Sequence, residues 1–148
     1  SILYGINFDN DAIYAYLGLI KYSGLSKEVI YSLEKLKNEI EKYTSFYSIS
    51  IFGSYATGNQ TKKSDLDIVI LIPNKSSESN IKIAAKMAET NALIPLHIEI
   101  ISSDDFFKML INKETNLGKE IAKKHKAVYN LDIFYKIIKK AINNGYKL

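Results

Sequence analysis

The 148-residue sequence contains no cysteine, no tryptophan and no arginine, so all 20 of its basic residues are lysine. Without cysteine the chain forms no disulfide and no cysteine-ligated zinc site, which fits a reducing compartment, and we expect it in the cytoplasm. Without arginine it lacks the side chain best suited to reading guanine, so we expect no specific DNA binding by this chain alone. Lysine still serves as a point charge for phosphate groups.

Long apolar runs are also missing. Although 47% of the residues are hydrophobic, no run approaches the roughly 20 residues of a membrane-spanning helix. The first residues show no signal-peptide pattern. We therefore expect no membrane partner, and the length suits one domain with a sizeable core.

The charge is distributed unevenly. Residues 1–100 carry 10 lysines and 11 acidic residues, a net charge of −1, whereas residues 101–148 carry 10 lysines and 5 acidic residues, a net charge of +5. A positive C-terminal part fits attraction of a polyphosphate or RNA. A soluble, lysine-rich helical surface explains it equally well, and the sequence leaves both interpretations open.

Hydrophobic periodicity divides residues 1–148, taken as one domain, into three parts: an N-terminal helical segment over 1–45, a core over 46–102 and C-terminal helices over 103–148. Residues 1–8 are strand-like. The remaining pattern predicts helices at about 11–22, 26–43, 79–92, from 103, 116–124 and 131–143, and strands at 48–52, 66–72, 96–101 and 125–130.

Two aspartates open the second of these strands. Asp65 and Asp67 are two residues apart, so strand alternation points both side chains to one face. Two carboxylates on one face repel each other unless a cation lies between them, and a hard divalent cation is the usual one. The apolar run Ile68–Ile72 that follows indicates a strand buried on both faces.

A glycine and a serine follow the strand at 48–52. Gly53 allows close approach to the backbone, and the segment beginning at Ser54 can open a helical turn whose free amide groups attract phosphate. The Ser54 hydroxyl adds one more donor. The stretch therefore combines a phosphate-binding turn with an acidic pair suited to a metal ion.

The combination of Gly53-Ser54, ten further residues and the Asp65-x-Asp67 pair resembles the signature of the DNA polymerase β-type nucleotidyltransferases. The surrounding F-G-S-Y-A-T-G and S-D-L-D-I-V-I-L-I most resemble minimal nucleotidyltransferases, including antitoxins paired with HEPN ribonucleases. Near the C-terminus, N-L-G-K-E-I more weakly resembles archaeal nucleotidyltransferases with an upstream winged-helix domain, most of which this chain would lack.

The resemblance implies an α/β fold with a small mixed β-sheet and helices packed on it. It also implies transfer of a nucleoside monophosphate, AMP being the first candidate, from ATP or another NTP to a hydroxyl group. Asp65 and Asp67 would hold two Mg²⁺ ions, and Gly53 and Ser54 would bind the phosphates. The resemblance expects a third acid on the next strand, where Glu99 would complete the metal site or act as the base.

The neighbourhood of Glu99 adds one histidine. His97 shares a face with Glu99 by strand alternation, yet a lone histidine is more often a surface or packed residue than a catalytic one. In the family the third acid is usually Asp, so the longer Glu99 side chain alters the expected metal geometry.

Three functions remain open from the sequence. The first is an active nucleotidyltransferase, such as an antitoxin that modifies a HEPN-type toxin. The second is a non-catalytic binding module with the same fold, and the third is the nucleotidyltransferase part of a DNA-binding regulator. The intact motif favours the first, and the tyrosine-rich N-terminal segment favours a protein partner over a nucleic acid.

Overall fold

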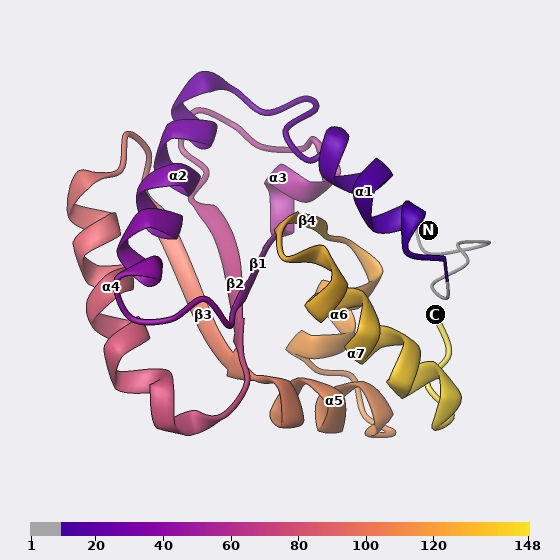
Figure 1. Cartoon of the computed structure of the whole chain (residues 1–148). Coiled ribbons are helices and arrows are strands. Elements are labelled where there is room, and N and C mark those ends of the chain that lie inside the picture. Colours follow the sequence, from indigo (N-terminus) through magenta and orange to yellow (C-terminus); the bar gives the residue numbers. More distant parts are fainter. Residues whose placement is uncertain (1–9) are drawn as a thin grey trace.

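A computed structural model describes residues 10–148, so the strand-like stretch at residues 1–8 lies outside the described residues. Four strands form one mixed sheet in the order β3-β2-β1-β4, with helices on both faces (Figure 1). The strands are β1 (Ser48–Phe52), β2 (Leu66–Ile72), β3 (Leu96–Ser102) and β4 (Lys126–Tyr129). The helices are α1 (Ala12–Leu19), α2 (Lys27–Glu41), α3 (Gly53–Thr57), α4 (Glu78–Asn91), α5 (Ser103–Ile111), α6 (Leu117–Lys123) and α7 (Leu131–Asn143). The predicted α/β fold with a small mixed sheet is confirmed.

Strand β2 lies in the interior of the sheet, antiparallel to β1 and parallel to β3. The five residues at its C-terminal end, Ile68–Ile72, are all buried, as the unbroken apolar run predicted. Complete burial of an isoleucine or leucine side chain contributes about 1.5–3 kcal/mol, so β2 is a rigid base for residues at its ends.

Alternation along β2 separates two hydrophobic cores. Leu66, Ile68, Ile70 and Ile72 pack with α2 and α4 on one face of the sheet. Val69 and Leu71 pack with residues of α5, α6 and α7 on the other face, where α1 also contributes Leu17. Figure 1 shows the same arrangement, with α2 and α4 on one side of the strands and α5, α6 and α7 on the other.

Side-chain caps fix the starts of three helices where the sequence predicted them. The Ser26 hydroxyl accepts a hydrogen bond from the Val29 amide at 3.3 Å, and Ser102 does the same for Asp105 at 3.1 Å. Asn116 Oδ1 accepts from the Lys119 amide at 3.1 Å. Each cap satisfies an amide that lacks a partner within its helix. Within residues 10–148, no helix is both long and apolar enough to cross a membrane.

The C-terminal segment completes the sheet. Strand β4 pairs antiparallel with β1, with a change of register near Ile49 and Ser50. In the sequence β4 lies between α6 and α7. Its pairing with β1 therefore connects these two helices to the central strands of the sheet.

Candidate functional site

Three strands bring the motif residues to one end of the sheet. In the register of β1 with β2, Phe52 lies opposite Asp67, so Gly53 follows directly beside that carboxylate. In the parallel register of β2 with β3, Asp67 lies opposite His97. The end of β1 and the starts of β2 and β3 therefore meet around Asp67.

Gly53 is in direct proximity to the Asp67 carboxylate. A Cβ atom added at Gly53 would lie 2.2 Å from Asp67 Oδ2, closer than any real contact. Gly53 also has φ of +65°, a left-handed conformation that favours glycine. The predicted close approach to the Gly53 backbone is therefore present, and the approaching group is the side chain of Asp67.

Ser54 is the second residue of the short helix α3 and is partly buried. The turn ends at Gly58, which has φ of +75°, and the amide of Asn59 donates to the Ser54 carbonyl at 3.0 Å. This turn places the first amides of α3 at the same end of the sheet as Asp67, where the sequence predicted a phosphate-binding turn.

His97 joins the two predicted acidic groups of β2 and β3. Its Nδ1 atom lies 2.8 Å from Asp67 Oδ1, and its Nε2 atom lies 3.3 Å from Glu99 Oε1. The hydrogen bond with Asp67 raises the pKa of the imidazole, and the negative charges of Asp67, Glu99 and Asp65 raise it further. The side chain is 55% exposed, so His97 is a surface residue as the sequence suggested. Its contact with both acids was missed, because it depends on the register between β2 and β3.

Glu99 contacts His97, which in turn bonds Asp67. It lies opposite Val69, two residues beyond His97 and on the same face as Asp67. Its proposed role as a third metal ligand stays a prediction. Over residues 10–148, no three His, Asp or Glu side chains converge as a preformed metal cluster.

Asp65 lies immediately before β2 and is exposed. Its negative charge contributes to the raised pKa of His97. Carboxylate oxygens suit Mg²⁺, which commonly uses one or two of them and completes its shell with water and substrate phosphates. The donors at Asp65 and Asp67 fit such a substrate-completed site.

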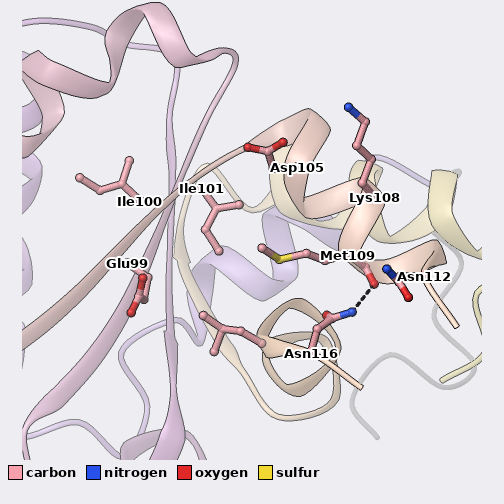
Figure 2. A pocket seen from close by; sticks show the side chains of 9 residues that line it. Glu99, Ile100, Ile101, Asp105, Lys108, Met109, Asn112 and Asn116 are labelled. Carbon is pink, nitrogen blue, oxygen red and sulfur yellow. Dashed lines mark hydrogen bonds between the residues drawn. The ribbon is translucent and has the colours of Figure 1, made fainter. Parts of the chain in front are cut away.

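A hollow of about 470 Å³ lies beside Glu99, between β3, α5 and α6. Figure 2 shows Glu99 and Ile101 on the strand, facing Met109 and Asn116 across this hollow. The Asn116 amide donates to the Met109 carbonyl at 2.7 Å and fixes the far wall. Its volume lies in the range of small-molecule sites.

Comparisons with known proteins point to one family. The family model described as "Polymerase beta, Nucleotidyltransferase" matches residues 34–134. No curated protein matches the chain.

The chain is also similar to parts of two solved structures. A "toxin-antitoxin with AMP-PNP" is 16% identical, with a TM-score of 0.45, over 80% of this chain and 86% of that one. A putative nucleotidyltransferase from Sulfolobus solfataricus is 22% identical, with a TM-score of 0.32, over 54% of this chain and 78% of that one.

Proposed function

Because the chain belongs to the polymerase β nucleotidyltransferase family, we propose that it transfers AMP, or another nucleoside monophosphate, from an NTP to a hydroxyl acceptor. The observation that carries this proposal is the contact between Gly53 and Asp67, which joins the turn after β1 to the acidic start of β2. The same contact brings the first turn of α3 and a fixed carboxylate to one end of the sheet.

Asp65 and Asp67 are the residues that would hold Mg²⁺. We expect two ions, as the sequence analysis does. Bound there, Mg²⁺ would neutralise the triphosphate and favour deprotonation of the attacking hydroxyl. Asp67 is fixed for this task, since Gly53 borders one carboxylate oxygen and His97 bonds the other. A fixed carboxylate loses little conformational entropy on binding.

Gly53 and Ser54 would bind the β- and γ-phosphates through backbone amides and the serine hydroxyl. Such groups, held in place before the substrate arrives, stabilise charge that builds up during phosphoryl transfer. Glu99 is the third acid on this face and acts near the acceptor, either directly on the site or through His97.

We place the acceptor on a protein, with a HEPN-type toxin as the candidate that the motif suggests. The absence of arginine disfavours nucleic acid. Two exposed side chains of α1, Tyr16 and Leu19, lie next to the exposed Ile20 that follows the helix. Such a patch suits a partner surface. The lack of cysteine is consistent with work in the cytoplasm.

Calorimetry with ATP, GTP, CTP and UTP, with and without Mg²⁺, tests the proposal. We expect binding of at least one NTP to require Mg²⁺, and to fall at least about tenfold in Asp65→Asn and Asp67→Asn, which each remove a metal-binding charge. Asp104→Asn is the matched control, because this exposed carboxylate pairs with Lys108 on α5. Binding that needs no metal, or is equal in all four proteins, would exclude the site.

A further inference from the structure

His97 occupies the position opposite Asp67 on the neighbouring parallel strand. Glu99, the third acid predicted from the sequence, lies two residues further along β3, opposite the apolar Val69. The side chain closest to Asp67 across the strand pair is therefore an imidazole and not a carboxylate.

The two ring nitrogens of His97 face two different acids. Nδ1 is 2.8 Å from Asp67 Oδ1, and Nε2 is 3.3 Å from Glu99 Oε1. Histidines that ligate metals commonly donate their second ring N–H to a carboxylate, which fixes the tautomer and the orientation of the ring. Glu99 stands in that place relative to His97.

The separation of Nδ1 and Oδ1 also suits a shared metal ion. Adjacent ligands of an octahedral ion with bonds of about 2.0–2.1 Å lie about 2.9 Å apart. The Nδ1 to Oδ1 distance of 2.8 Å is close to this edge. Both atoms can therefore bind one ion once Nδ1 has lost its proton and the ring has turned its lone pair from Asp67 Oδ1 towards the ion.

Building on the proposed function, we propose that His97 Nδ1 is a ligand of the metal ion at Asp67, and that Glu99 is a positioning residue which holds the ring through Nε2–H. The remaining ligands are Asp65, water and the triphosphate oxygens. This assignment replaces the direct metal role that the sequence suggested for Glu99.

One nitrogen ligand changes which ion the site prefers. Mg²⁺ takes oxygen ligands almost exclusively, whereas imidazole binds first-row transition metals well. Of these, Mn²⁺ shares the preference of Mg²⁺ for carboxylate and phosphate oxygens. The site therefore binds Mn²⁺·NTP more tightly than Mg²⁺·NTP.

Pulsed electron paramagnetic resonance on the full chain, loaded with Mn²⁺ and a non-hydrolysable ATP analogue, tests the nitrogen ligand directly. We expect ¹⁴N modulation from one directly bound imidazole in the wild type. This modulation should disappear in His97→Asp, which offers a carboxylate oxygen in place of the imidazole nitrogen. His125, the second of the two histidines, is buried and bonds the Ile121 and Ala122 carbonyls and Tyr135. A signal that persists in His97→Asp would overturn the assignment.

Calorimetry on the same proteins separates the roles of His97 and Glu99. In His97→Asp, the ratio of Mn²⁺·nucleotide to Mg²⁺·nucleotide affinity should fall at least about fivefold, as a nitrogen ligand is replaced by oxygen. In Glu99→Gln the amide oxygen occupies the same place beside Nε2 but carries no charge, so the nitrogen signal remains while Mn²⁺ affinity falls about tenfold. A Glu99→Gln protein without the nitrogen signal, or with unchanged affinity, would contradict the positioning role.

Two experimental outcomes distinguish an error in the His97 assignment from an error in the proposed function. If metal·nucleotide binding depends on Asp65 and Asp67 but the wild type shows no ¹⁴N modulation, the His97 assignment is wrong and the proposed function stands. If the wild type binds no metal·nucleotide at all, both are wrong.

Discussion

At the start of β2, two neighbours fix the Asp67 carboxylate in different ways. Gly53 borders Oδ2 so closely that no side chain fits between them, and His97 bonds Oδ1. The sequence predicted Gly53 and Asp67 separately, each for its own chemistry. Their contact could not be predicted, because it arises from the antiparallel register that sets Phe52 opposite Asp67.

Replacing Gly53 by alanine tests this contact. Gly53→Ala places a methyl group against Asp67 Oδ2, so we expect the carboxylate to move and Mg²⁺·NTP affinity to fall at least about tenfold, as metal binding requires fixed ligand geometry. Calorimetry measures the Mg²⁺·NTP affinity, and chemical denaturation measures the change in the free energy of unfolding.

Gly58→Ala is the matched control. Gly58 has φ of +75°, similar to the +65° of Gly53, but a Cβ there would contact nothing within 4 Å. It carries the same left-handed strain, about 1–2 kcal/mol, without the contact. Equal nucleotide affinity in the two variants would show that the Gly53 contact has no role in the site.

At the scale of the elements, the helices and strands followed from capping residues and periodicity. Ser26, Ser102 and Asn116 cap helices that begin close to the predicted starts. The pairing of elements was less accessible to sequence analysis. The register of β2 with β3, which brings His97 to Asp67, depends on how α4 returns the chain, and local pattern does not encode it.

The junction of α5 and α6 gives a prediction at this scale. A Cβ at Gly118 would lie 2.6 Å from Met109 Cβ, so Gly118→Ala pushes apart the two helices that border the hollow of Figure 2. We expect the free energy of unfolding to fall by about 1–3 kcal/mol, the usual cost of overpacking. Thermal and urea denaturation would measure it.

Gly18→Ala in α1 serves as the comparison. A Cβ at Gly18 meets nothing within 4 Å, so the substitution should raise the free energy of unfolding by about 0.5 kcal/mol through higher helix propensity. If Gly118→Ala is as stable as Gly18→Ala, α5 and α6 are not packed through Gly118.

At the scale of the whole molecule, one buried histidine ties the C-terminal elements together. The carbonyls of Ile121 and Ala122 can only accept, so His125 Nδ1 carries the proton, and Nε2 accepts from the Tyr135 hydroxyl. The ring also packs against Phe134 of α7. The cluster thereby joins α6, the start of β4 and α7.

This burial makes the stability of the fold depend on pH. Desolvation lowers the pKa of His125 to about 4, from about 6.5 in an unfolded chain. As the pH falls below about 6.5 the unfolded chain takes up a proton that the folded chain does not. Stability is therefore complete above that pH and falls by about 3 kcal/mol as the pH approaches 4.

Urea denaturation between pH 7.5 and 4.5 checks this prediction. The pH dependence should become shallower in His125→Gln, which cannot take up a proton. His97→Gln, at an exposed histidine, should retain the loss of stability at low pH. A wild-type stability that is constant over this range would contradict the account of His125.

The central claim is that the metal and the triphosphate bind between Gly53 and the acids at the start of β2. A crystal structure of the chain with Mn²⁺ and a non-hydrolysable ATP analogue tests it most directly through anomalous scattering. We predict a manganese peak within about 2.3 Å of an Asp67 carboxylate oxygen, with the triphosphate over Gly53 and Ser54. A nucleotide bound elsewhere, or manganese with no contact to Asp65 or Asp67, would contradict the claim.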